Sequence, residues 1–416
     1  MMRAIGFLSF YDRLAAAPML VVLATQMNVS LTDAIRIVSA YALLYALGQP
    51  LWGLISDRYG RVPVLRVALV GTIAATAASV MAVNLPMLIL ARAVAGLFVG
   101  SLFPTLLTIL GDSYTASTRA REISSLQVFT ALGATFATLI AGVPATWTDW
   151  RVVFAITGVG AAWLVVQMIP HRAGTQSSSP ERSTRSAFSK WPIWLYMLAL
   201  LEGGILQGIL TYIVPALEYA GLSLGLAGLI GSAYGLGIIG GAALTKRLVS
   251  RIGRTAIIGT GVGVLIAAFA AATASQGPAA LAMTSLFLGI SNALLHSSLQ
   301  GWVTDIAPHA RATAVSIFVC CLFLGSSLAT SVTAPFTVNG YSTIFAMTFA
   351  VSIVLVLLAT GSHWFWSRPG STDTTGWRTT SRADLADVAS QSAGGHARSS
   401  DSTRTNAPNS PRWFPG

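Results

Sequence analysis

Twelve long apolar stretches follow one another along this chain, separated by short polar segments. A helix needs about 20 mostly apolar residues to span the hydrocarbon core of a bilayer. Charged residues make up only 9% of the chain, whereas about one quarter of a soluble domain is charged. We therefore predict an all-α membrane protein with twelve transmembrane helices. The predicted spans are 6–27, 33–54, 64–83, 87–110, 123–144, 152–170, 191–216, 224–246, 256–275, 279–302, 312–334 and 342–364.

The spans form two related halves. The segment Ser39–Arg61 aligns without a gap on Ser232–Arg254, an offset of 193 residues, and the same offset pairs Gly96 with Gly289. Two matches at one offset indicate the duplication of a whole bundle of helices. Such a duplication is typical of secondary transporters, in which the substrate site lies between the repeats.

Composition divides the chain into four segments. We predict an N-terminal six-helix bundle at 1–170 and a C-terminal six-helix bundle at 191–366, which together form a pseudo-symmetric pair. The segment 171–190 between them is Ser-rich and basic, a composition typical of a flexible linker. The segment 367–416 has too few large apolar residues to bury a core, so we predict a disordered tail.

Basic residues lie almost entirely in connections on one side of the predicted bundles. The opposite connections carry only Arg151. The positive-inside bias makes the rich side cytoplasmic, so we expect a multi-pass protein of the plasma (inner) membrane with both termini in the cytoplasm. We therefore attribute the net charge of +11 to interaction with the membrane surface, and we expect no nucleic-acid partner. The basic set on the rich side is Arg58, Arg61, Arg66, Arg119, Arg121, Arg172, Arg182, Arg185, Lys190, Lys246, Arg247, Arg251, Arg254 and Arg311.

Catalytic and cofactor motifs are missing from the sequence. It has no G-x-x-x-x-G-K-[ST] phosphate loop, no His and Cys spacing for a metal, and no G-x-S-x-G elbow. We therefore predict a protein that is not an enzyme and holds no cofactor or metal. Transport without ATP must draw on a gradient.

The segment GLISDRYGR, between the second and third predicted spans, matches a family motif. Gly53, Asp57, Arg58, Gly60 and Arg61 stand where the major facilitator superfamily carries G-x-L-a-D-R-x-G-R-[RK], with a departure at Val62. The chain resembles this family over nearly everything before the tail. The resemblance implies a carrier in which two bundles rock about a central site for a small molecule.

The resemblance also implies a charged latch at this loop. Asp57 can accept a hydrogen bond from Arg61 and face the positive N-terminus of the eleventh span, with Asp112 as a second partner of Arg61. In the family such a cluster latches the halves in the outward-facing state. In the second copy Arg254 and Asp305 remain but the acid that corresponds to Asp57 is missing, so we expect a stronger latch on the first-half side. The alternative is that the loop arginines only set the topology.

Two acids lie within predicted spans, Asp12 in the first and Glu202 in the seventh. Charged groups inside a bilayer are costly, so each is a candidate functional residue. The 193-residue offset places Glu202 opposite Ser9, one helical turn from Asp12, and in the family these two spans line the central cavity. We expect the acids to couple transport to protons or to contact a cationic substrate. The alternatives are a structural ion pair of Asp12 with an arginine, or an interfacial Asp12 that meets water.

Arg92 in the fourth span and Arg13 in the first are further candidates. Arg92 begins ARAVAG, which resembles the family's R-x-x-Q-G motif with Ala95 in place of the glutamine. That motif implies a role in proton movement, whereas either arginine could instead reach toward the membrane interface. We expect other polar groups at membrane depth to line the cavity, although each could instead make a hydrogen bond between helices. These are Tyr41, Gln49, Gln127, Gln207, Tyr234, Asn292 and His296.

The first span and the loop look most like bacterial exporters of the drug and proton antiporter type. We predict proton-coupled efflux of a small, partly apolar compound by a monomer embedded in the bilayer. One alternative is a proton-coupled importer of a sugar, amino acid or organic anion, with Arg13 or Arg92 on an anionic group. An alternative of another class is a membrane sensor or partner protein that kept the fold but lost transport, and that docks through its tail.

Overall fold

A computed structural model of the chain describes residues 1–113, 116–142, 149–168, 184–248, 251–307 and 310–368. Within these ranges every regular element is a helix. The chain divides into a compact unit at Met1–Thr360 and a second unit at Gly361–Gly416. Of the second unit the described part is the end of the last helix, where the Arg368 guanidinium lies 3.4 Å from the centroid of the Trp364 ring. Of the predicted linker the structure describes residues 184–190, which include the short helix η2, and of the predicted tail it describes residues 367 and 368.

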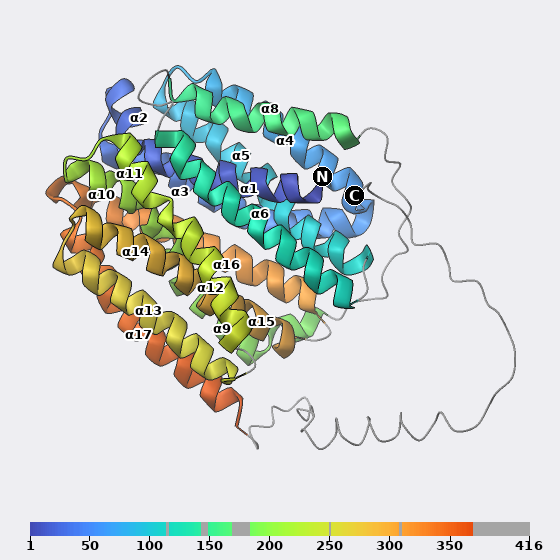
Figure 1. Cartoon of the computed structure of the whole chain (residues 1–416). Coiled ribbons are helices and arrows are strands. Elements are labelled where there is room, and N and C mark those ends of the chain that lie inside the picture. Colours follow the sequence, from blue (N-terminus) through green and yellow to red (C-terminus); the bar gives the residue numbers. More distant parts are fainter. Residues whose placement is uncertain (114–115, 143–148, 169–183, 249–250, 308–309, 369–416) are drawn as a thin grey trace, which may run out of the picture. The chain divides into compact units, whose positions relative to one another are not determined.

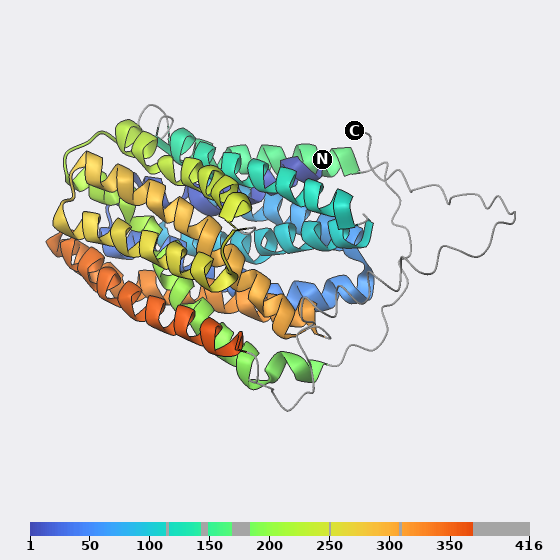
Figure 2. The same ribbon diagram turned by 60° about the horizontal axis from the view of Figure 1, so that its bottom comes forward.

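The first half of the larger unit is a set of helices that lie alongside one another (Figures 1 and 2). Gly60 has a φ of 91°, a left-handed value that glycine adopts without strain. It therefore turns the chain sharply from the second span into the third. The elements are α1 (Met2–Ala15), η1 (Ala17–Met19), α2 (Leu20–Gln26), α3 (Leu31–Tyr59), α4 (Arg61–Val80), α5 (Leu85–Ser113), α6 (Ala116–Gly142) and α8 (Arg151–Met168).

The second half repeats this arrangement, but two of its spans are interrupted. The seventh span changes from α-helix to a π-helical segment, η3, and then to a short 3-10 turn, and the tenth span contains a second π-helical segment, η5. Such segments are rare and frequently lie at functional sites. The elements are η2 (Thr184–Phe188), α9 (Lys190–Gly203), η3 (Gly204–Gly208), η4 (Ile209–Tyr212), α10 (Ile213–Tyr219), α11 (Leu224–Gly231), α12 (Ala233–Leu248), α13 (Arg254–Ala274), α14 (Pro278–Ser291), η5 (Asn292–His296), α15 (Ser297–Ile306), α16 (Arg311–Thr333), η6 (Ala334–Asn339) and α17 (Ser342–Trp366).

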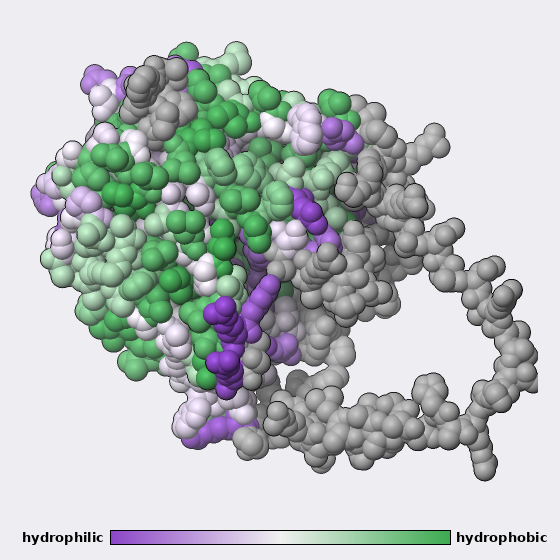
Figure 3. Space-filling view, in the orientation of Figure 1, coloured by the Kyte–Doolittle hydropathy of each residue, from purple (hydrophilic) through white to green (hydrophobic). Residues whose placement is uncertain are grey.

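The predicted fold class is confirmed. Among the described residues, eleven helices are long and apolar enough to cross a membrane, and a shorter apolar helix, Ser125–Ala141, supplies the twelfth predicted span. Apolar side chains cover much of the face seen over α11, α13 and α14, whereas hydrophilic atoms gather at the end of α12, whose last turn carries Lys246 and Arg247 (Figure 3). This distribution suits a molecule whose flanks contact lipid.

The close helix crossings repeat between the halves. A Cβ on Gly96 would collide with the carbonyl oxygen of Tyr41, and a Cβ on Gly289 would collide with that of Tyr234. Both pairs are related by 193 residues, so α5 crosses α3 as α14 crosses α12. Glycine also permits two other close crossings. A Cβ on Gly133 of α6 would collide with the carbonyl oxygen of Phe7 on α1, and one on Gly325 of α16 would collide with that of Leu200 on α9.

Candidate functional site

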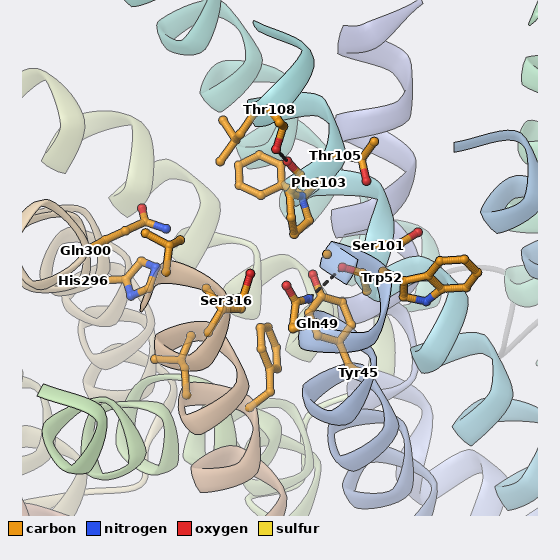
Figure 4. A pocket seen from close by; sticks show the side chains of 18 of the residues that line it. Tyr45, Gln49, Trp52, Ser101, Phe103, Thr105, Thr108, His296, Gln300 and Ser316 are labelled. Carbon is orange, nitrogen blue, oxygen red and sulfur yellow. Dashed lines mark hydrogen bonds between the residues drawn. The ribbon is translucent and has the colours of Figure 1, made fainter. Parts of the chain in front are cut away.

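A cavity of about 860 Å³ lies between helices of the two halves. Figure 4 shows side chains from α3, α5, α16 and the His296 region projecting toward this common space. Gln49 donates from Nε2 to the carbonyl oxygen of Gly100 over 2.7 Å, which fixes its amide against α5. The cavity extends to Arg61, at the helix ends that also carry Lys246 and Arg254. We call this the basic end of the molecule.

Six of the predicted cavity residues line this space, and five lie behind its lining. The six are Arg13, Gln49, Gln127, Gln207, Asn292 and His296. The other five, Asp12, Tyr41, Arg92, Glu202 and Tyr234, are all buried and do not line the cavity.

Asp12 and Arg92 form a buried ion pair. Arg92 donates from Nη1 to Asp12 Oδ1 over 2.9 Å and from Nη2 to Oδ2 over 3.0 Å, and both side chains are 0% exposed. The guanidinium carbon of Arg92 lies 4.7 Å from the centroid of the Tyr41 ring and 4.6 Å from that of the Phe154 ring. Of the alternatives stated from the sequence, the structural ion pair is therefore the one observed. Arg92 does not reach the membrane interface.

Glu202 meets the cavity through His296. The Nδ1 atom of His296 lies 3.2 Å from Oε1 of Glu202, and His296 is 20% exposed whereas Glu202 is 0% exposed. Within the described part of the chain no hydrogen-bond donor is aligned on either carboxylate oxygen. The imidazole is therefore the polar group that separates this carboxylate from the cavity.

The π-helical segments hold this pair. Glu202 lies two residues before η3, and His296 is the last residue of η5. Five residues after Glu202 and four residues before His296, Gln207 donates from Nε2 to Asn292 Oδ1 over 3.4 Å. The seventh and tenth spans thus meet at two polar contacts, both beside irregular backbone.

Arg13 is one of the basic residues in the cavity lining. Its guanidinium carbon lies 4.2 Å from the centroid of the Phe10 ring and 5.4 Å from that of Phe323. Its buried Nε has no hydrogen-bond partner among the described residues. No carboxylate of the described chain forms an ion pair with it, because the neighbouring Asp12 is held by Arg92.

The predicted latch is described only in part. Arg61 donates from Nη1 to Ser56 Oγ over 3.0 Å, and Arg254 forms an ion pair with Asp305. The side chains of Asp57 and Asp112 lie outside the described residues. The relative strength of the two latches therefore stays a prediction.

The halves are joined by hydrogen bonds on the side of the cavity away from the basic end. The hydroxyl oxygens of Ser39 on α3 and Thr330 on α16 lie 2.8 Å apart, and Ser327 donates to the carbonyl oxygen of Ser39 over 2.8 Å. Along α3 these contacts precede Tyr45, the first residue of that helix in the lining. The cavity is thus closed at this level and continues toward Arg61.

Several lining residues were not predicted from the sequence. Gln300 lies one turn beyond His296, and Thr105 and Thr108 lie one and two turns beyond Ser101 on α5 (Figure 4). Their spacing of three or four residues places them on one helix face, a signal that was present in the sequence. Phe10 and Phe323 carry no such signal, because aromatic residues are common throughout apolar spans.

A bundle of membrane-spanning helices, built from two repeats around a cavity, defines the class of membrane transporters. The chain belongs to the Major Facilitator Superfamily, whose family model matches residues 4–330 and 213–380. The chain is 30% identical over 150 residues to a triacylglyceride transporter of Mycolicibacterium smegmatis, a match that covers 35% of this chain and 26% of the relative. It is 30% identical over 118 residues to the efflux pump dotC of Dothistroma septosporum, covering 28% and 20%. The matched segments thus span about a quarter or less of these relatives.

A solved structure shows the same fold over most of the chain. The crystal structure of a D-xylose-proton symporter superposes with a TM-score of 0.70 at 19% identity, covering 86% of this chain and 95% of the symporter. The shared architecture therefore extends well beyond the segments that align with these two relatives.

Proposed function

We propose that this transporter couples efflux of a small, partly apolar molecule to protons through Glu202 and His296. The observation that carries the proposal is the 3.2 Å separation of a fully buried carboxylate from an imidazole that lines the cavity. Intramembrane ionisable residues of this kind mark proton relays. Histidine suits the relay because imidazole commonly serves as a proton shuttle in proteins.

The charge of the pair would control closure of the cavity. With one proton shared, the imidazolium and the carboxylate are neutral together, and when that proton leaves, a negative charge remains in the helix bundle. Burying an uncompensated charge is costly, so the halves close more readily around the protonated pair. The flanking π-helical segments place this pair where the seventh and tenth spans meet.

The basic end supports one orientation of the carrier in the membrane. The excess of basic residues there supports a cytoplasmic position, so the cavity faces the cytoplasm and both termini lie on that side of the plasma membrane. The hydrogen bonds of Ser39 with Thr330 and Ser327 then close the outer side. Importers and exporters both pass through a state that opens to the cytoplasm, and the efflux pump among the relatives supports transport out of the cell.

Replacing Glu202 with Gln tests the coupling. We expect Glu202→Gln to abolish transport driven by a pH gradient in proteoliposomes and to retain exchange of substrate at equal pH, because exchange moves no net proton. The substrate for the assay is the compound that most raises the melting temperature of the purified protein in a ligand screen.

The matched control is Glu218→Gln, which removes the other carboxylate of the same span. Glu218 does not line the cavity, so this variant should keep gradient-driven transport. Unchanged driven transport in Glu202→Gln would remove Glu202 from the mechanism. Inward accumulation of substrate with the proton gradient would instead favour the importer.

A further inference from the structure

The charges around the cavity are distributed unequally. Its lining contains Arg13, Arg61 and His296, and among the described residues no Asp or Glu takes part in it. Two buried acids lie outside the lining. Asp12 forms an ion pair with Arg92, and Glu202 lies beside His296. A cationic substrate would therefore meet only positive or neutral side chains here.

Arg13 has the free capacity that an anion would use. A guanidinium carries donors in a planar fork that matches a carboxylate, and that of Arg13 forms no ion pair within the described chain. An arginine at membrane depth normally pairs with an acid or with carbonyl groups. The chain supplies a carboxylate to the neighbouring Arg92, whose Nη1 and Nη2 atoms bind Asp12. Arg13 has the Tyr45 hydroxyl beside it but no such carboxylate among the described residues, so its guanidinium can accept one from a ligand.

Aromatic rings surround this cation on several sides. Phe10 forms an edge-to-face contact with Phe103 at a centroid separation of 5.3 Å, and Tyr45 lies 4.1 Å from Phe323 by the same measure. All four rings line the cavity. Aromatic rings pack favourably against other rings in offset or edge-to-face contacts. This part of the cavity therefore offers the guanidinium of Arg13 next to a surface that can bind a planar aromatic group.

We propose that Arg13 anchors the carboxylate of an aromatic monocarboxylate whose ring lies among Phe10, Tyr45, Phe103 and Phe323. This inference rests on the proposed function in one respect, since it takes the cavity as the substrate site. A single carboxylate matches the single unpaired cation at this depth, because Arg61 lies at the basic end. The anchor also bridges the repeats, since Phe10 belongs to α1 and Phe323 to α16.

Binding of matched acids and amides to purified protein tests the anchor. The probes are benzoate, 2-naphthoate and indole-3-acetate, each with its neutral amide, and binding is followed by thermal stabilisation without any gradient. We expect at least one acid to bind the wild type at least about tenfold more tightly than its amide, since hydrogen bonds to charged groups are the stronger ones. Arg13→Gln should remove this preference and leave the affinity for the amide unchanged.

Two further variants keep the test decisive. Arg13→Lys retains the charge without the fork and should retain part of the preference for the acid, and its melting temperature without ligand reports whether the fold tolerates changes at this position. Arg36→Gln removes a cation that pairs with Asp33 outside the cavity and should bind every probe as the wild type does. Equal binding of acid and amide by the wild type, or a preference that survives in Arg13→Gln, would overturn the anchor. Because no gradient is applied, a failure of proton coupling would leave these results unaffected.

Discussion

Two neighbouring ionisable residues on α1 have different surroundings. Asp12 is enclosed with Arg92 and shielded by two aromatic rings, whereas Arg13 lines the cavity. Replacing one partner of a buried ion pair leaves an uncompensated charge, which is far more costly than loss of an exposed pair. The first pair thus ties α1 to α5, and the second position remains open to a ligand.

Replacing Asp12 should therefore act mainly on stability. We expect Asp12→Asn to lower the free energy of unfolding by about 3–5 kcal/mol, because Arg92 would remain buried without its carboxylate. Asp33→Asn, which removes the acid of the exposed Arg36 pair, should cost under about 1 kcal/mol. Melting temperatures of the purified variants measure both effects, and equal losses would contradict a structural role for the Asp12 and Arg92 pair.

The sequence identified these charged residues as important but did not identify the contacts of each one. The cost of intramembrane charge identified Asp12, Arg13, Arg92 and Glu202 as candidate functional residues, and a functional role for them stays a prediction. Which of them form pairs depends on which faces of α1 and α5 pack together. Because these helices carry apolar residues on every face, the sequence does not indicate the packed face. Both acids were expected to act alike, whereas the structure encloses one with a strong base and places the other beside an imidazole.

Helices were predicted better than the interruptions within them. Each predicted span corresponds to an observed helical segment to within a few residues, because length and hydropathy determine what can cross a bilayer. The π-helical segment η5 carries neither proline nor glycine, so no breaker signals it, whereas η3 begins at Gly204 and ends at Gly208. They depend on tertiary packing, which single-sequence patterns do not contain.

The glycine crossings make a prediction for packing between helices. Gly289→Ala should separate α14 from α12, because its Cβ would collide with the carbonyl oxygen of Tyr234, at a cost of about 1–3 kcal/mol typical of overpacking. Gly263→Ala on α13 is the matched control, since its Cβ would meet no atom within 4 Å. Thermal melting should show a loss for Gly289→Ala alone, and tolerance of both changes would argue against a close crossing there.

Across the whole unit, the two repeats have diverged in a way that suits a coupled carrier. The first half holds a closed ion pair between α1 and α5, and the second half holds the Glu202 and His296 pair between interrupted spans. One repeat thus contains a buried ion pair, and the other contains irregular backbone beside an imidazole and a carboxylate. Among the described residues, the hydroxyl contacts of Ser39 join the repeats on the side of the cavity away from the basic end, which suits a rocking mechanism.

Proton flux caused by a substrate gradient gives the clearest test of this account. Proteoliposomes that enclose a pH-sensitive dye receive a gradient of the compound found in the ligand screen, with no pH gradient imposed. The account predicts that substrate movement changes the internal pH with the wild type and with Glu218→Gln, but not with Glu202→Gln, although exchange continues. A pH change of wild-type size in Glu202→Gln, or none in the wild type during measurable transport, would contradict coupling through the Glu202 and His296 pair.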